Sequence, residues 1–293
     1  MNLNPLYQKQ DINYEFNVSF FERLILRCLQ FGKLPRHMGV IMDGNRRYAK
    51  SHNLSTKEGH RKGSLKFVEL LKWSCIIGIE IITVYAFSLE NFKRDRQEVY
   101  DLFDLFLDRL NFILNQIKEL GDNQFVNTAF HGYHVRFCGD KQRLPEELQD
   151  KIKTLESYTR KMENPNGNGK RMLLNICVCY TSTNDIHQGI NKVRNELERS
   201  LIKLEDIDNL KSNLFSADFK DVICPDLIFR TGGNSRLSEF LTFQSAFSFL
   251  SFNNITWPQL NLIHFVRIIL DFQLHYPFIK QAIRAQNMKM NQS

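Results

Sequence analysis

The chain has 293 residues, of which 43% are hydrophobic and 24% charged, so it can bury a sizeable core and has the composition of a globular protein. Its net charge of +7 suits an anionic substrate or an anionic membrane surface, and neither a long Lys/Arg run nor a zinc-finger spacing points to nucleic acid. We recognise no secretory signal and no uncharged stretch long enough to span a bilayer, which predicts a cytosolic setting with free thiols.

The N-terminal region predicts a loose tail over residues 1–18 and a helix over 19–32. Ser19 can cap this helix and Gly32 can end it. Its apolar positions are Phe20, Phe21, Leu24, Ile25, Cys28 and Phe31. Such a face fits a helix that lies on a membrane or one that covers the core, and the sequence leaves both open.

The most informative segment is 37–48, an apolar run of strand type that turns at Asp43-Gly44-Asn45 and continues into Arg46 and Arg47. Glycine allows close approach of a ligand, and arginine makes charge-assisted contacts with phosphates. The segment therefore suits a metal-chelated phosphate. An ordinary tight turn after a buried strand is the alternative.

A second strand, over 80–87, also ends in polar and charged side chains, here Ser88, Glu90, Asn91 and Arg94. A solvated loop is the alternative there. Between these two strands we expect a helix from about 57 to 77 that ends at Gly78.

Apolar residues in 96–120 recur three and four apart on more than one face, which predicts a long buried helix. The helix could instead line an apolar cavity. Further on, we expect a polar loop over 121–133, strands over 133–140, 172–180, 225–229 and 248–252, and a turn over 164–169. The remaining helices are expected over 145–163, from 181 to about 203, in a weaker patch over 205–216, and from Pro258 to near Pro277.

Strands alternating with helices predict one α/β domain with a mostly parallel, six-stranded sheet flanked by helices on both faces. Ligands of such sheets bind outside the carboxyl ends of the strands. Asp43, Asn91 and Arg230 each follow a predicted strand, and Arg230–Ser238 combines two arginines, hydroxyl side chains and two adjacent glycines. We therefore expect one phosphate-rich active site built from three distant segments.

Five motifs in this order and spacing resemble the cis-prenyltransferase family, which includes undecaprenyl and dehydrodolichyl diphosphate synthases. The resemblance covers roughly residues 35–272, and Arg46-Arg47-Tyr48 is similar to the eukaryotic dolichol branch. The motifs are Met42-Asp43-Gly44-Asn45-Arg46-Arg47-Tyr48-Ala49-Lys50, Glu58-Gly59-His60, Tyr85-Ala86-Phe87-Ser88-x-Glu90-Asn91-Phe92-x-Arg94, Arg230-Thr231-x-Gly233-x-x-Arg236-Leu237-Ser238-x-Phe240-Leu241-x-x-Gln244, and Trp257-Pro258.

The resemblance implies repeated cis-condensation of isopentenyl diphosphate onto farnesyl diphosphate. Asp43 would hold Mg²⁺ against a diphosphate, and helix 96–120 would line a tunnel for the product. Ser88 and Asn91 would lie where the proton lost after condensation leaves, with Asn91 orienting or relaying because an amide is a poor base. The residues implied at the allylic diphosphate are Gly44, Asn45, Arg46, Arg47, His60 and Arg94, with the motif residues Tyr48, Glu90 and Phe92 beside them. Those implied at isopentenyl diphosphate are Arg230, Arg236 and Ser238.

The chain also departs from the family pattern. Thr56 stands where an arginine is frequent, and Phe249 stands where bacterial members carry a metal-binding glutamate. The segment 279–287 lacks the terminal Arg-x-Gly motif of homodimeric members. The resemblance therefore implies a partner, an accessory subunit related to the Nogo-B receptor, at the cytosolic face of the endoplasmic reticulum or on lipid droplets.

The expected organisation is an N-terminal tail and amphipathic helix with membrane contact over 1–34, a catalytic domain over 35–275 and a polar tail over 276–293. A non-catalytic subunit of the same complex is the first alternative, and it is disfavoured because Asp43, Asn91 and Arg230 are all present. An unrelated nucleotide-binding module is the second, but no Gly-x-x-x-x-Gly-Lys-Ser/Thr or Gly-x-Gly-x-x-Gly follows any predicted strand.

Overall fold

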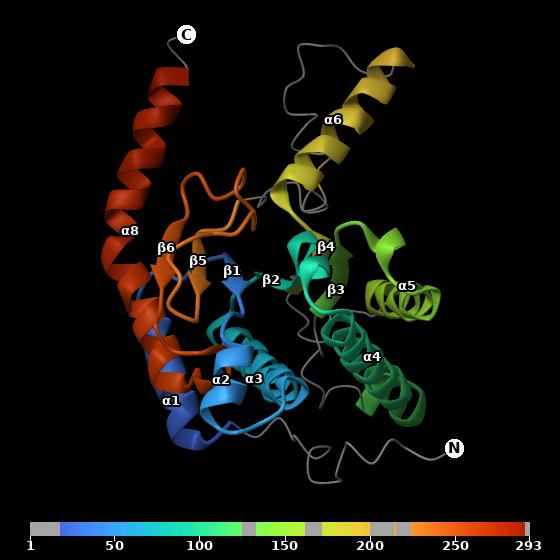
Figure 1. Ribbon diagram of the computed structural model, residues 1–293. Helices are drawn as coiled ribbons and strands as arrows, with labels where there is room; N and C mark the ends of the chain where they lie inside the picture. Colours follow the sequence, from blue (N-terminus) through green and yellow to red (C-terminus); the bar gives the residue numbers. More distant parts are fainter. Residues whose placement is uncertain (1–17, 125–132, 162–171, 200–213, 215–223, 291–293) are drawn as a thin grey trace.

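A computed structural model describes residues 18–124, 133–161, 172–199, 214 and 224–290 of the protein (Figure 1). The predicted turn over 164–169, the predicted patch over 205–216 except residue 214, and most of the predicted loop over 121–133 lie outside the described residues. No described helix is long and apolar enough to cross a bilayer.

The centre of the molecule is one sheet of six parallel strands, as predicted. The strands are β1 (His37–Ile41), β2 (Ile81–Ser88), β3 (Tyr133–Cys138), β4 (Met172–Tyr180), β5 (Leu227–Arg230) and β6 (Phe249–Phe252), in the order β3-β4-β2-β1-β5-β6. β4 is buried along almost its whole length, which explains why it reads as a continuous apolar run. In this order β1 lies between β2 and β5, so the segments that follow these three strands meet at one edge.

The helices are α1 (Phe20–Leu29), α2 (Asn45–Ser51), α3 (Thr56–Ile77), α4 (Arg96–Gln124), α5 (Glu146–Lys161), α6 (Ser182–Glu198) and α8 (Leu262–Met290). Short 3-10 turns cover Leu89–Lys93, Lys141–Arg143 and Trp257–Gln259. The predicted limits of α3 are confirmed: the Ser55 hydroxyl accepts the amide of Glu58, and Gly78 ends the helix with φ of 88°.

The two faces of the sheet are covered differently. The main core lies on one face, where α1, α3, α4, α5 and α8 pack. On the other face Ile41, Cys177 and Ile228 pack under Phe240 and Leu241, two residues of the loop after β5, and the first turn of α6 is hydrogen-bonded to this loop. The loop is thus part of the fold and is positioned by core packing.

The sequence left two roles open for the apolar face of α1, whereas the end of α8 differs from expectation. α1 attaches through the buried Leu26 and Leu29, while the apolar face seen in the sequence is exposed. α8 does not end near Pro277 but continues to Met290. A proline removes one helical hydrogen bond, and Ile279, packed against the core two residues later, favours continuation of the helix.

Candidate active site

Asp43 lies two residues after the end of β1 and is fixed by its backbone. Its carbonyl oxygen accepts the amide of Trp257 at 2.9 Å and the hydroxyl of Thr231 at 2.8 Å. Gly44 follows with φ of 105° and precedes α2, a conformation that few other residues adopt without strain. The predicted turn is therefore present, and side chains from two other segments hold it.

The Asp43 carboxylate meets Arg230, the last residue of β5. Asp43 Oδ2 accepts hydrogen bonds from Arg230 at 2.7 Å and from Asn234 at 3.0 Å. The second guanidinium NH₂ group of Arg230 donates to Ser238 Oγ at 2.8 Å and to the carbonyl oxygen of Arg236. One buried arginine thus joins the acid after β1 to the hydroxyl of the loop after β5.

These contacts set the charge of the site. Burial disfavours the ionised form of Asp43, but hydrogen bonds from Arg230 and Asn234 and the positive charges of Arg230 and Arg47 outweigh it, so its pKa lies below the usual value. Asp43 is therefore an anion at neutral pH. Its Oδ1 accepts no hydrogen bond within the described chain and lies 3.7 Å from the nearest Arg47 nitrogen.

Arg47 enters the site because Gly232 leaves room for it. The Arg47 guanidinium donates to the carbonyl oxygen of Gly232. Gly232 has φ of 88°, and a Cβ there would lie 2.6 Å from an Arg47 nitrogen and 3.0 Å from the Asp43 carbonyl carbon. The loop after β5 therefore approaches Asp43 as closely as only glycine allows.

A second cluster lies between α3 and α4. Arg94 pairs with Glu98 at 2.9 Å, and the same carboxylate lies 3.8 Å from Arg46. Burial and the charges of Arg94 and Arg46 lower the pKa of His60 to about 4, so its imidazole is neutral at pH 7. Its Nε2 atom is buried and has no hydrogen-bond partner among the described residues, which leaves a polar atom for a ligand.

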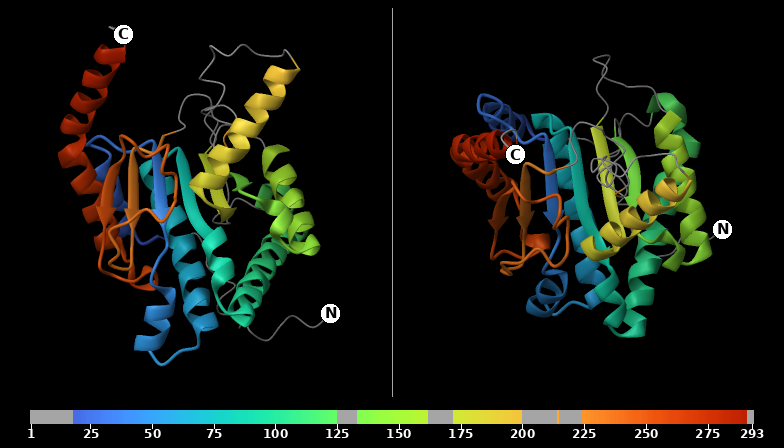
Figure 2. Two further views of the ribbon diagram at one scale, coloured as in Figure 1. Left: turned by 45° about the horizontal axis from the view of Figure 1, so that its top comes forward. Right: turned by 90° about the horizontal axis from the view of Figure 1, so that it is seen from above.

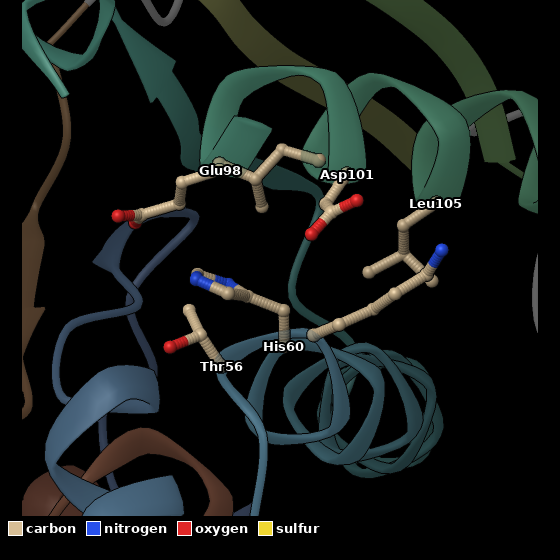
Figure 3. A pocket seen from close by; sticks show the side chains of 7 residues that line it. Thr56, His60, Glu98, Asp101 and Leu105 are labelled. Carbon is tan, nitrogen blue, oxygen red and sulfur yellow. The ribbon is translucent and has the colours of Figure 1, made fainter. Parts of the chain in front are cut away.

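His60 and Thr56 of α3 face Glu98, Asp101 and Leu105 of α4 across a pocket (Figure 3). Its volume is about 210 Å³. Ordinary ligand pockets have volumes of about 300–1,000 Å³. The product tunnel expected along helix 96–120 therefore stays a prediction. The apolar residues of α4 are divided between this pocket and the core.

The segment after β2 joins the site through hydrogen bonds. Asn91 Oδ1 accepts the amide of Ser88 at 3.1 Å, and this pairing caps the 3-10 turn Leu89–Lys93. The Tyr85 hydroxyl of β2 lies 3.1 Å from the Tyr180 carbonyl oxygen and 3.2 Å from the Ser238 carbonyl oxygen. β2 and the loop after β5 are therefore linked through one phenol.

Other predicted binding residues have protein partners instead. Glu90 pairs with Lys93 and its side chain is 61% exposed, Tyr48 stacks on His52 with ring centroids 4.1 Å apart, and Phe92 packs edge-on against Phe87. The side chain of Asn45 donates to the Met42 carbonyl oxygen at 3.3 Å. Arg236 is exposed, and its backbone carbonyl makes the contact with Arg230.

The two departures from the family pattern have clear positions. Thr56 lines the pocket beside His60. Phe249, however, pairs with Leu227 at the amino end of β6, whereas Phe252 pairs with Arg230. Three residues of strand span about 10 Å, so residue 249 lies at the opposite end of β6 from the residue that pairs with Arg230.

Sequence reasoning missed three contributors: Asn234, Thr231 and Glu98. Asn234 and Thr231 lie within the predicted anion-binding loop, so the loop was found but not its contacts with Asp43. Glu98 of α4 is four residues after Arg94, which precedes the helix, and this spacing already indicates an ion pair.

The donor set fits Mg²⁺ bound together with a diphosphate. Mg²⁺ is generally held by one or two carboxylates plus phosphate oxygens and water, and Asp43 presents an Oδ1 that accepts no hydrogen bond within the described chain and lies 3.7 Å from Arg47. No cluster of three or more acidic, His or Cys ligands occurs in the described ranges, so a site made of protein ligands alone is not seen there. The Nε of Arg230 is buried without an acceptor among the described residues, as expected for a donor that meets an anion.

A parallel α/β sheet with an acid, four arginines and a neutral imidazole at its carboxyl edge defines an enzyme site for phosphorylated substrates. The family model described as putative undecaprenyl diphosphate synthase matches residues 41–276. The chain therefore belongs to this family of cis-prenyltransferases, and it is a cis-prenyl diphosphate synthase.

Individual relatives agree. A tritrans,polycis-undecaprenyl-diphosphate synthase (geranylgeranyl-diphosphate specific) of Picrophilus torridus is 38% identical over 86% of this chain and 92% of its own. The human dehydrodolichyl diphosphate synthase complex subunit is 33% identical over 92% of this chain and 76% of its own. The structure of lavandulyl diphosphate synthase from Lavandula x intermedia, in complex with dimethylallyl diphosphate, has a TM-score of 0.70 at 25% identity and covers 82% of this chain and 95% of that one.

Proposed function

We propose that this protein is the catalytic subunit of a dehydrodolichyl diphosphate synthase. It adds isopentenyl diphosphate repeatedly, with cis double bonds, to farnesyl diphosphate, and the long polyprenyl diphosphate serves dolichol formation and protein glycosylation. The observation that carries the proposal is the chain of contacts from Asp43 through Arg230 to Ser238. These contacts support a single site in which an acid, a cation and a hydroxyl act on two diphosphate groups.

The two clusters suggest a division of substrates. His60, Arg94 and Arg46 suit the allylic diphosphate, since the pocket beside His60 is lined in part by the apolar Leu102 and Leu105, which suit the start of a prenyl chain. Arg230 through its Nε, Arg236 and Ser238 suit isopentenyl diphosphate. Asp43 lies between them, and Mg²⁺ bound there would neutralise the negative charge that develops on the leaving diphosphate.

Asn91 and Ser88 are assigned to the proton lost after condensation. Asn91 Oδ1 is already hydrogen-bonded to the Ser88 amide, so its side chain is fixed in place. An amide is a poor base, and a diphosphate oxygen or a water molecule is therefore the acceptor, with Asn91 orienting the group.

The starting substrate has a second candidate. The names of archaeal relatives specify geranylgeranyl diphosphate. Farnesyl diphosphate is the first choice because Arg46-Arg47-Tyr48 resembles the eukaryotic dolichol branch. Direct competition of the two allylic diphosphates in one reaction distinguishes these candidates.

We also propose a heteromer with a Nogo-B-receptor-like accessory subunit. β6 is an edge strand with one described neighbour, and Leu250 and Phe252 on it, with Phe243 and Phe247 before it, are 37–43% exposed. An apolar sheet edge is a surface that proteins normally cover. The complex would work at the cytosolic face of the endoplasmic reticulum and on lipid droplets, with peripheral membrane contact, because its product is too apolar to leave into water.

The test is incorporation of labelled isopentenyl diphosphate onto farnesyl diphosphate with Mg²⁺, using this chain alone and with a candidate partner. Incorporation that requires this chain and is lost in Asp43→Ala supports the catalytic assignment. Incorporation that persists in Asp43→Ala would show that the partner holds the active site and that this chain is the accessory subunit.

A further inference from the structure

α1 presents an apolar surface to the outside although the helix is firmly attached. Leu26 and Leu29 are buried, and the Gln30 side chain donates to the Ile76 carbonyl oxygen on α3 at 3.0 Å. In contrast, Phe20 and Phe21 are 75% and 74% exposed, and Phe31 is 94% exposed. Leu24 and Ile25 are also exposed. The helix is thus held by one side and displays its large aromatic residues on the other.

α8 shows the same feature. Leu270, Leu274 and Phe278 are four residues apart and so form one stripe, with exposed fractions of 44%, 70% and 69%. The core side of the helix is formed by Phe265 and Phe272, which are buried. The outer stripe of α8 is therefore apolar without contributing to the core.

The two helices lie side by side (Figures 1 and 2). The Gln273 side chain of α8 donates to the Leu29 carbonyl oxygen of α1 at 2.7 Å. Just past α1, the Lys33 ammonium lies over the ring of Tyr276 at 5.6 Å from its centroid. The outward apolar residues of both helices consequently belong to one region of the surface, which we call the α1–α8 face. It consists of Phe20, Phe21, Leu24, Ile25, Phe31, Leu270, Leu274 and Phe278.

We propose that the α1–α8 face binds the surface of an anionic lipid bilayer, with α8 contributing as well as α1. Exposed cations border the apolar residues: Arg23 and Arg27 on α1, Lys33 after it, and Lys280 and Arg284 on α8. Apolar side chains between basic ones are the pattern by which a helix lies in the interface of a negatively charged membrane.

Charge favours lipid over protein as the occupant. The acidic residues of the described parts of α1 and α8 are Glu22 and Asp271, and Glu22 is used in the Ser19 cap. The border is therefore strongly positive, which suits a uniformly anionic surface. The inference deepens the membrane contact of the proposed function and rests on it, since a prenyl product would be delivered where the enzyme already touches lipid.

The test is flotation of the full chain with phosphatidylcholine vesicles, with and without phosphatidylserine, at low and high salt. One variant carries Phe20→Ser and Phe21→Ser, a second carries Leu274→Ser and Phe278→Ser, and a control carries Tyr100→Ser, which is 61% exposed on α4. We expect the wild type to bind only the anionic vesicles and to release with salt, and both double variants to lose about tenfold or more in partitioning while the control does not.

Circular dichroism melting verifies that the variants fold, and their incorporation of isopentenyl diphosphate in detergent should be unchanged. This activity readout separates failure of membrane binding from failure of the proposed function. Full binding by the Leu274/Phe278 variant would overturn the role of α8. Absence of vesicle binding by the wild type, together with dimerisation through these residues, would overturn the proposal in favour of a protein interface.

Discussion

Asp43 and Arg230 are 187 positions apart in the sequence, yet their side chains meet in a hydrogen bond of 2.7 Å. The contact follows from the parallel pairing of β1 with β5, in which Ile41 is the partner of Arg230. Arg230 is only 5% exposed, so its charge depends on this acid for compensation. The metal-binding role proposed for Asp43 and the stability of the site are therefore coupled.

Replacing Asp43 by Asn keeps the size and an acceptor for Arg230 but removes the negative charge. We expect turnover to fall by about 10²–10³-fold, because the metal and the leaving diphosphate lose their carboxylate. The measurement is the steady-state rate of isopentenyl diphosphate incorporation at saturating Mg²⁺. Asp150→Asn, at a carboxylate that is 77% exposed, serves as the matched control and should behave as wild type. A near-normal rate in Asp43→Asn would contradict the assigned role.

Gly232→Ala and Gly78→Ala form a matched pair, because both glycines have φ of 88°. The backbone strain of an alanine, about 1–2 kcal/mol, is then common to both variants. Only at residue 232 would the new methyl group collide with Arg47 and Asp43, since no atom lies within 4 Å of a Cβ at residue 78. We expect both proteins to melt at lower temperature and only Gly232→Ala to lose activity. Equal activity in the two variants would show that the close approach of the loop is not required.

His60 predicts a pH dependence of stability. Its pKa is lowered from 6.5 to about 4 in the folded protein, so the unfolded chain takes up a proton first as the pH falls. The free energy of unfolding is therefore unaffected above pH 6.5 and decreases between about pH 6.5 and 4, by roughly 2–3 kcal/mol from this residue.

Urea unfolding of wild type and His60→Gln at pH 7.5 and 4.5 checks this. The variant should lose less stability between the two pH values, while the share that comes from His37, whose burial lowers its pKa to about 3, remains in both proteins. Parallel losses in the two proteins would mean that His60 is not kept neutral by burial.

Leu105 gives a test of the product path. It lines the pocket between α3 and α4 together with His60. Leu105→Trp should block extension of the prenyl chain and shift the products, resolved by reverse-phase chromatography, to shorter lengths. Tyr100→Trp, on the exposed side of the same helix, should leave the product distribution unchanged. Unaltered products from Leu105→Trp would place the growing chain elsewhere.

Apolar runs and turn residues were sufficient to predict all six strands, and the carboxyl-edge rule predicted the approach of Asp43 and Arg230, whose side chains are in contact. Side-chain orientation was not predictable in this way. The sequence indicated that Arg230 binds an anion, but not that its two NH₂ groups would be bonded to Asp43 and Ser238 within the protein. The position of Phe249 relative to Arg230 also required the strand register, because the sequence alone does not show which residue of β6 pairs with Arg230.

The helices at the edge of the fold show a similar limit. Periodicity identifies an apolar face on α1, but burial depends on which neighbours are available, and Leu26 and Leu29 contact α3 and α8 instead. Pro277 was interpreted as a helix end because it lacks an amide hydrogen. The local sequence does not show that Ile279 packs against the core, and this packing favours continuation of α8.

The placement of β5 beside β1 also has a consequence for biosynthesis. Most of the chain must leave the ribosome before Arg230 can pair with the acid that follows β1, and contacts of such long sequence separation slow folding. A nascent or prematurely terminated chain that stops before β5 would carry all of α1 to α6 and still have no active centre. The site can therefore form only after β5 has left the ribosome.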